Sequence, residues 1–496
     1  MTADPGIEVR GGVAGTAVGL DELAAAAGQL AQCATVLGEV VVRLAAATAA
    51  TGVSAPLSPV TAVRAEAELA GATRALAREA AAVGGVAIAV RSAAWAYREV
   101  EQEVVRTTAL AQDVVMAAVG RATPTLVVGV VALDAIGVDV GNLLDRAVWE
   151  APQLADLAGG SGGLVFGLRS NPVTAPFVAP PYRVGSGPYG RAPAGDADPD
   201  EAAIGVLADS AAAWGLLSDD GVVRVTAAGR RSGDHVSTDG DSADNGMAVA
   251  RAPTGLGDLA RDQAALPGDA RVRIVEVSGE QGPAWIVEIG GTQVWDPRAG
   301  DNPFDLTTDV RSMAAESSLL AAGVQQALAA AQSRAASSTR GRDVAAEPVL
   351  LSGHSLGGIV AAGLASSAQF RAAHRVTHVV TLGSPVARVP VPPGVRVLSV
   401  EHRQDPVPRL EGRPNPDRAG WVTVSRDLEG APQADLRASA AHRSERYVET
   451  AAAVDASEDR SVAGWRASAG AFFAGPDQTS TAVVRDYRIA RVGPAP

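Results

Sequence analysis

The chain has 496 residues, of which 47% are hydrophobic and 20% are charged, so a disordered chain is excluded as the default. At roughly 150 residues per domain, this length predicts two or three folded domains. All 42 basic residues are arginine, which excludes phosphate-binding loops, kinase sites and Schiff-base mechanisms that need a lysine amine. The net charge of −13 argues against a nucleic-acid partner, and the single cysteine, Cys33, excludes an intrachain disulfide and a thiolate metal cluster.

The beginning of the chain does not have the pattern of a secretory signal, because acidic residues stand where a positive segment and an apolar segment are required. The longest uninterrupted apolar stretch covers residues 126–133 and ends at Asp134. A membrane-spanning helix needs about 20 apolar residues, so we expect no transmembrane segment. The protein is expected to be cytoplasmic, exported without a conventional signal peptide, or associated with the cell envelope.

The first third of the chain is predicted to be helical. Apolar residues recur at spacings of three and four over residues 30–44, which is the period of one helix face. Pro56 and Pro59 interrupt this pattern, and a second helical pattern follows over about residues 60–111. We expect the two segments to form an antiparallel hairpin with a seam of Ala, Val and Leu, followed by another helix at about 141–157.

Glycines and prolines cluster between residues 159 and 200, which is the composition of a linker. We therefore predict a helical module over residues 1–158, a linker over 159–200 and a second domain over 201–496. In the second domain, strand patterns alternate with helical patterns, so we expect an α/β fold with a mainly parallel sheet, preceded by an all-α helical-hairpin region. The predicted strands lie at 222–226, 272–277, 285–289, 349–352, 376–382, 396–400 and 421–424, and the predicted helices at 306–335, 356–370, 443–454 and 462–473.

The sequence Gly353-His-Ser-Leu-Gly357 stands between a predicted strand and an Ala-rich predicted helix. This context is that of a nucleophile elbow, a tight strand-to-helix turn that holds a serine in a strained backbone conformation. The glycines are required because a Cβ on either side would clash within the turn. We predict Ser355 as the nucleophile and the amide of Leu356, at the start of the helix, as a donor to an oxyanion.

A serine hydroxyl needs a base, which in turn needs an acid to orient it, and the elbow fold supplies them in the order Ser, Asp or Glu, His. Asp405 follows the predicted strand 396–400, and His442 is the one histidine of six that comes after it. We therefore predict Asp405 as the acid and His442 as the base, while a local turn is the other role open to an Asp-Pro pair. His354 is set aside because it lies inside the turn, and His402 because it precedes Asp405. The other candidates for the acid are Glu401, Asp417 and Asp427.

A second oxyanion donor is expected from the loop after an earlier strand. Gly290-Gly291-Thr292-Gln293 follows the predicted strand 285–289, and its two glycines allow a close backbone approach. We nominate the amide of Thr292, with Gln293 as the alternative and an ordinary turn as the other interpretation. The acidic segment 234–246 lacks one oxygen ligand of a calcium loop and is interpreted as a solvated loop, so the sequence indicates no metal or organic cofactor.

These segments resemble the serine lipase and esterase branch of the α/β-hydrolases, in particular the class 3 lipase-like group. The resemblance covers about residues 271–454 and implies an α/β-hydrolase fold that cleaves carboxylic esters, lipid-like or short-chain, through an acyl-enzyme. It implies that Ser355 is the nucleophile, His442 the base and then the acid, and Asp405 the group that orients the imidazole. The matching segments are Gly353–Gly358, Thr381–Pro385, Gly291-Thr292, Asp405–Pro408 and His442 ahead of Tyr447.

The helical hairpin resembles modules on substrates of actinobacterial type VII (ESX-like) secretion. This resemblance rests on Trp95 and on Tyr97, which stands four residues before Glu101. It implies export or a helical partner protein, while a lid over the active site and a docking surface are the other interpretations of the module. For the second domain, the alternatives to an esterase are a hydrolase-fold binding protein without turnover and an acyltransferase with the same triad.

Overall fold

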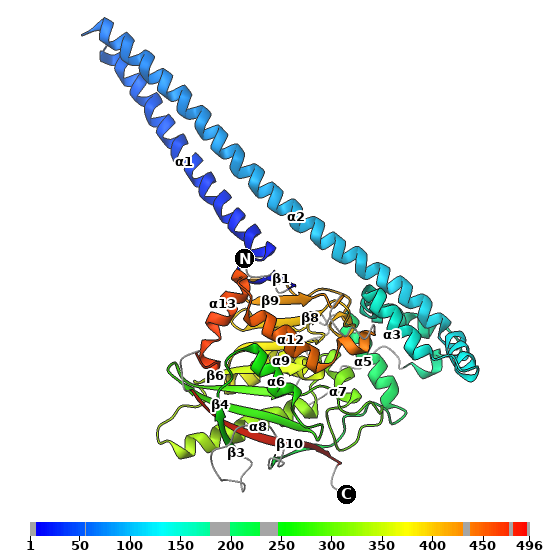
Figure 1. Ribbon diagram of the computed structural model, residues 1–496. Helices are drawn as coiled ribbons and strands as arrows, with labels where there is room; N and C mark the ends of the chain where they lie inside the picture. Colours follow the sequence, from blue (N-terminus) through cyan, green and yellow to red (C-terminus); the bar gives the residue numbers. More distant parts are fainter. Residues whose placement is uncertain are drawn as a thin grey trace. The chain divides into compact units, whose positions relative to one another are not determined.

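The structure is a computed structural model in which the residues group into two compact units (Figure 1). One unit consists of residues 16–107, and the other combines residues 1–15 with residues 108–496. The described residues are 6–54, 56–178, 199–228, 247–429, 437–475 and 480–493. The acidic segment 234–246 lies outside them, as does the part of the predicted linker from 179 to 198.

Two long helices, α1 (Thr16–Ser54) and α2 (Pro59–Ala135), supply the smaller unit. Gly84 of α2 lies near Ala34 of α1, and Arg98 of α2 forms an ion pair with Asp21, closer to the start of α1. The two helices therefore run antiparallel. Helix α2 continues through Gly84-Gly85 and past residue 111, where the predicted pattern ends. The buried hydrophobic side chains that the structure describes between residues 16 and 107 are all alanines, namely Ala27, Ala62, Ala87 and Ala94.

The two helices correct the expectation that the chain has no transmembrane segment, which was wrong. Helices Thr16–Val53 and Pro59–Ala135 are both long and apolar enough to cross a membrane, judged by length and composition. The expectation failed because it counted uninterrupted apolar residues. A spanning helix tolerates Gly, Ala, Thr and an occasional charge, so its overall composition is the relevant quantity.

The end of α2 belongs to the larger unit and packs against short helices. These are α3 (Val140–Glu150), the 3-10 segment η2 (Pro152–Gly160) and α4 (Ser161–Ser170). The backbones of α2 and α4 are in close contact, since a Cβ on Gly120 would lie 2.5 Å from the Leu164 carbonyl oxygen. The first part of the predicted linker is thus helical, and the boundaries at 158 and 200 stay a prediction.

The larger unit is built on one mixed sheet. Within the described residues, its strands follow the order β1-β9-β8-β7-β6-β5-β4-β10-β2, and β3 pairs with β10. The run from β5 to β9 is parallel, whereas β4 pairs with β5, and β1 with β9, in antiparallel fashion. The predicted α/β class, a mostly parallel sheet preceded by a long helical region, is confirmed. The strand bounds are β1 Ile7–Gly11, β2 Val222–Ala228, β3 Met247–Arg251, β4 Arg271–Gly279, β5 Gly282–Ile289, β6 Pro348–His354, β7 Arg375–Leu382, β8 Arg396–His402, β9 Trp421–Arg426 and β10 Thr481–Val492.

Strand β10 lies outside the predicted elements, which place helices at the end of the chain. Its sequence is interrupted by charged residues, and this obscures the strand pattern. In the sheet, these charges find partners on the neighbouring strand β4. Arg273 Nε donates to Asp486 at 2.8 Å, and Arg485 Nη1 lies 2.8 Å from a Glu276 carboxylate oxygen. These ion pairs offset the cost of burying the charged side chains of β10. From the sequence alone, the same charges argue against a central strand.

Helices cover both faces of the sheet. One apolar core lies under α8, α9 and α10, and the other under α6, α12 and α13 (Figure 1). Two predicted helices are each divided in the structure, 306–335 into α7 and α8 and 356–370 into α9 and α10. The helix bounds are α5 Pro199–Ala212, α6 Leu256–Ala264, α7 Leu306–Met313, α8 Leu319–Ser338, α9 Leu356–Ser366, α10 Ala368–Ala373, α11 Ala438–Ala441, α12 Ser444–Asp455 and α13 Arg460–Ser468.

Candidate active site

The turn between β6 and α9 has the geometry of a nucleophile elbow. Ser355 has φ 54° and ψ −122°, a conformation that side-chain-bearing residues rarely adopt. A Cβ on Gly353 would lie 2.0 Å from the carbonyl carbon of Gly357, and a Cβ on Gly357 would lie 2.1 Å from the Ile289 carbonyl oxygen. Both glycines are therefore required sterically, and the strained backbone presents the serine at the carboxyl end of the central strand.

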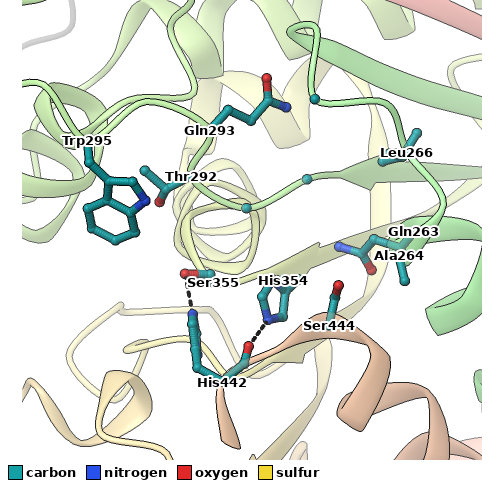
Figure 2. Close-up of a pocket in the computed structure, with 13 residues that line it drawn as sticks. Gln263, Ala264, Leu266, Thr292, Gln293, Trp295, His354, Ser355, His442 and Ser444 are labelled. Atoms are coloured by element: carbon teal, nitrogen blue, oxygen red, sulfur yellow. Dashed lines mark hydrogen bonds between the residues drawn. The ribbon is translucent and has the colours of Figure 1, made fainter. Parts of the chain in front are cut away.

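The three residues predicted to act as nucleophile, acid and base come together at this turn. His442 Nε2 lies 2.9 Å from Ser355 Oγ (Figure 2), and His442 Nδ1 lies 2.7 Å from Asp405 Oδ2. Because an ionised carboxylate can only accept, Nδ1 carries the proton, and Nε2 is left to accept from the serine hydroxyl. Asp405 is fully buried in the loop that follows β8, whereas the His442 side chain is 19% exposed. The arrangement allows one proton to pass between Ser355 and His442.

The carboxylate of Asp405 also stabilises its own loop. Its Oδ1 accepts a hydrogen bond from the Val407 amide at 2.9 Å, which is the local turn considered as the other role of this residue. Two of the alternative acids bond to other partners. Glu401 accepts from Asn415 at 2.5 Å, and Asp427 accepts from the Gln404 side chain at 2.7 Å. Neither of these hydrogen bonds involves the imidazole of the candidate base.

Two further histidines hold the segment that carries His442. His354 Nε2 donates to the His442 carbonyl oxygen at 2.9 Å, and His402 Nδ1 donates to the Ala441 carbonyl oxygen at 2.8 Å. Burial, and next the proximity of His442, lower the pKa of His354 to about 3, and burial lowers the pKa of His402 to about 4. Both rings are thus neutral donors near neutral pH. The sequence reasoning set both residues aside as bases and missed this positioning role.

Tyr447 supports the acid from α12. Its hydroxyl donates to Asp405 Oδ2 at 2.6 Å, and its ring stacks on His402 with centroids 4.0 Å apart. Burial and the neighbouring Asp405 carboxylate raise the pKa of Tyr447 well above its usual value, so the phenol keeps its proton. The resemblance noted that Tyr447 follows His442 but did not indicate a role for it. The Asp405 carboxylate therefore receives three hydrogen bonds, from His442, Tyr447 and the Val407 amide.

The loop after β5 lies directly beside the elbow. A Cβ on Gly291 would lie 3.0 Å from His354 Nδ1 and 3.3 Å from Ser355 Cβ. The Thr292 hydroxyl donates to Asp309 Oδ2 at 2.8 Å, so its side chain is turned toward α7. The amide of Gln293 already donates to the Phe304 carbonyl oxygen at 2.8 Å. Of the two nominated loop donors, Thr292 therefore fits better, and it would act together with Leu356, whose amide is among the first of α9.

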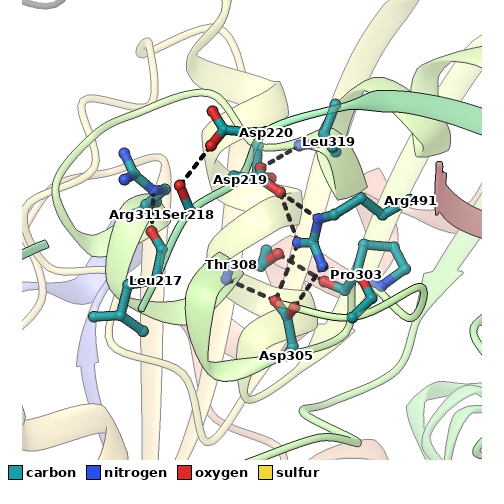
Figure 3. Close-up of polar contacts among 12 residues, drawn as sticks. Leu217, Ser218, Asp219, Asp220, Pro303, Asp305, Thr308, Arg311, Leu319 and Arg491 are labelled. Carbon is teal, nitrogen blue, oxygen red and sulfur yellow. Dashed lines mark hydrogen bonds and ion pairs between the residues drawn. The ribbon is translucent and has the colours of Figure 1, made fainter. Parts of the chain in front are cut away.

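A buried polar cluster fixes this loop to the sheet (Figure 3). Arg491 of β10 places one guanidinium nitrogen 2.6 Å from Asp305 Oδ2 and another 2.6 Å from Asp219 Oδ1. Asp305 in turn accepts from the Thr308 amide at 2.9 Å and caps the start of α7. Strand β10, one of the strands that the sequence did not predict, thus anchors the loop carrying the candidate oxyanion donor.

A cavity of about 250 Å³ opens beside the nucleophile (Figure 2). Small or polar side chains dominate its lining, and Leu266 and Trp295 are its large apolar members. Trp295 is 67% exposed, so this side of the cavity reaches solvent. In the part of the chain that the structure describes, no cluster of three or more His, Cys, Asp or Glu is arranged to hold a metal ion. The remaining lining residues are Gln263, Ala264, Gly268, Gly290, Gly291, Thr292, Gln293, His354, Ser355, His442 and Ser444.

Comparison with known families gives a match to part of the larger unit. Residues 307–428 match the family model of the PGAP1-like alpha/beta domain. That family has the hydrolase fold and is serine esterase-like, so the match supports a hydrolase activity in general. It includes Ser355 and Asp405 but ends before His442, so the candidate base comes from outside it. No curated protein and no solved structure matches the chain.

Proposed function

We propose that the protein is a serine hydrolase that cleaves carboxylic esters through an acyl-enzyme. The observation that carries this proposal is the position of His442, within hydrogen-bond distance of both Ser355 Oγ and Asp405 Oδ2. A binding protein that retained only the fold would have no need to keep this chain of three groups in register beside a strained serine. Ser355, Asp405 and His442 are the proposed nucleophile, acid and base.

The reaction follows from where the protons are held. Ser355 Oγ attacks the ester carbonyl carbon while His442 Nε2 takes the hydroxyl proton, and the amides of Leu356 and Thr292 stabilise the oxyanion. When the tetrahedral intermediate collapses, the carbon–oxygen bond to the alcohol breaks and His442 returns the proton to the departing oxygen. Water then attacks the acyl-serine in the same way, releasing the acid and restoring the hydroxyl. Asp405 stays ionised and stabilises the imidazolium.

The size and lining of the cavity limit the length of the acyl group that the site would accept. Its volume of about 250 Å³ is below the range of drug-sized ligand sites, and its lining is small and polar around the serine. The acyl carbons nearest the carbonyl would occupy it, and Trp295 would contact a longer chain or the alcohol at the exposed side. We expect turnover of p-nitrophenyl esters to be highest with short acyl groups and to fall as the chain lengthens.

A fluorophosphonate probe tests the proposal, because it reacts with an activated serine and needs no knowledge of the substrate. The intact protein should be labelled, and Ser355→Ala should not. Ser384→Ala is a matched control, since this second buried serine lies near the elbow and should not affect labelling. Labelling that survives Ser355→Ala, or an intact protein that neither reacts with the probe nor hydrolyses any ester, would favour a non-catalytic binding protein.

We also propose that the helical pair of residues 16–107 carries information for export. Trp95 and Tyr97 are 64% and 52% exposed on α2, so neither serves as a core residue. Exposed aromatic side chains are available for recognition by another molecule. Changing both to Ala should lower the amount of protein found outside an actinobacterial host without changing its thermal stability. Unchanged export would remove the support that these residues give.

A further inference from the structure

The end of α2 and the start of α3 form an apolar projection on the larger unit, which we call the α2–α3 tip (residues 126–144). Its apolar side chains are exposed to an unusual degree, including 69% for Val128, 63% for Val131 and 74% for Ile136. An exposed cluster of this kind on a folded unit marks a contact with something outside the chain. The other exposed apolar residues of the tip are Leu126, Val127, Val130, Leu133, Leu143 and Leu144.

The apolar side chains surround the helix instead of lining one face. Between Arg121 and Asp134 there is no charged residue, and successive positions along the helix each turn by about 100°. Val127, Val128 and Val130 therefore point in different directions. A protein groove covers one side of a helix, so it would leave part of this surface in water. Hydrocarbon surrounds a helix on every side and covers such a surface completely.

The tip is mounted firmly on the catalytic unit. On one side, Asp113 of α2 accepts from the Gly163 amide of α4 at 2.8 Å. On the other side, Asp145 of α3 accepts from the Ser439 amide at 2.7 Å and from its hydroxyl at 2.5 Å. Trp149 of α3 packs in a small core with Ala441, the residue before His442. Whatever the tip binds is therefore held to the same body as the candidate triad.

The charges near the tip favour one kind of lipid. Residues 121–150 contain two arginines and four acidic residues, and the whole chain carries a net charge of −13. Anionic headgroups would be repelled by such a surface, whereas zwitterionic headgroups would not. Binding should then depend on buried apolar area and hardly at all on salt.

We propose that the α2–α3 tip inserts its apolar side chains into a zwitterionic lipid surface and thereby holds the catalytic unit at that surface. The proposal concerns binding alone, so it stands or falls separately from the proposed hydrolysis. If turnover were absent, the binding measurement would still decide it. If binding were absent, the serine could still be reactive.

The experiment is co-flotation of the full chain with phosphatidylcholine vesicles. The unmodified protein should float with the vesicles at both low and high salt, and Val127→Asp/Val131→Asp should reduce the floated fraction about tenfold or more. The matched control is Val86→Asp/Ile88→Asp, which alters two exposed apolar residues of α2 in the smaller unit and should float like the unmodified protein. Thermal unfolding and fluorophosphonate labelling should be the same for all three proteins.

Three results would overturn the proposal. The first is a tip variant that floats as well as the unmodified protein. The second is loss of flotation in the Val86/Ile88 control, which would assign lipid contact to the helical pair. The third is an unmodified protein that ignores the vesicles but self-associates through the tip, so that the tip variant becomes a monomer. That result would identify a second copy of the chain as the partner.

A labelled variant keeps the test decisive if the two aspartates disturb folding. Cys33 is exposed and can be replaced by serine, after which Val131→Cys provides a single site for an environment-sensitive dye. The dye emission should shift to the blue when phosphatidylcholine vesicles are added. A dye at position 88 of the same background should show no shift, and equal emission at position 131 with and without vesicles would contradict insertion.

Discussion

The helical pair of residues 16–107 and the sheet unit place their apolar side chains in opposite ways. In the sheet unit, large side chains such as Trp285, Trp421 and Phe304 are fully buried. In the helical pair, the buried hydrophobic side chains that the structure describes are alanines, while residues such as Val100 stand 63% exposed. The sheet unit thus buries the large side chains that stabilise a core, whereas the helical pair leaves most of its hydrophobic surface exposed and available to other molecules.

Removal of the candidate base, His442, should have the largest effect on the sheet unit and none on the helical pair. His442→Ala should lower ester turnover by roughly 10⁴-fold or more, because the serine loses its proton acceptor. Thermal stability should change little, since the imidazole is partly exposed. Trp95→Ala, in the helical pair, is the control and should leave turnover unaltered. A His442→Ala protein with near-normal rates would show that another group serves as the base.

Removal of a large core side chain comes next. Trp421→Ala should lower the free energy of unfolding by about 3–5 kcal/mol, because it leaves a cavity between β9 and its neighbours. Val100→Ala should change it by no more than about 0.5 kcal/mol. Denaturant unfolding followed by circular dichroism measures both. Comparable losses for the two variants would mean that the helical pair is packed as tightly as the sheet unit.

Removal of the Tyr447 hydroxyl, which donates to Asp405, should have a moderate effect on ester turnover. Tyr447→Phe removes one of the hydrogen bonds that hold the Asp405 carboxylate in position, worth about 1.4 kcal/mol, and the less well oriented carboxylate should lower turnover roughly tenfold. The carboxylate would then interact more strongly with the imidazolium, so the acid limb of the pH–rate profile should move to higher pH. Tyr97→Phe is the matched control in the helical pair. An unmoved profile would assign Tyr447 a purely structural role.

The smallest effect concerns Asp309, beside the loop of Thr292. Burial, and next the neighbouring Asp305 carboxylate, outweigh the hydrogen bond from Thr292 and raise the pKa of Asp309 to about 7. The folded protein therefore binds this proton more tightly than the unfolded chain, and the group lowers stability as the pH rises from about 4 to about 7. Asp309→Asn should raise the melting temperature above pH 7 and have little effect near pH 4. Equal shifts at both pH values would contradict the raised pKa.

Local rules account for what could be predicted. The elbow around Ser355 is encoded by adjacent glycines and a strand-to-helix change, and chain order was enough to nominate Asp405 and His442, which the structure brings into hydrogen-bond contact. The supporting residues His354 and His402 could not be inferred, because each acts on a main-chain carbonyl that only the folded loops bring near. Strand β10 was missed for a related reason, since its charged side chains are compatible with a central strand only when they pair with charged residues of β4.

The pairing of β1 with β9 has a consequence for how the chain is assembled and cut. Strand β1, Ile7–Gly11, is made long before its hydrogen-bonding neighbour β9, Trp421–Arg426. That border of the sheet must stay open on the ribosome until β9 has emerged. Residues 16–107 are an excursion that leaves and re-enters one folded body. A single protease cut between α1 and α2 should therefore release no fragment. The piece before the cut stays bound through β1, and the piece after it contains the rest of that folded body.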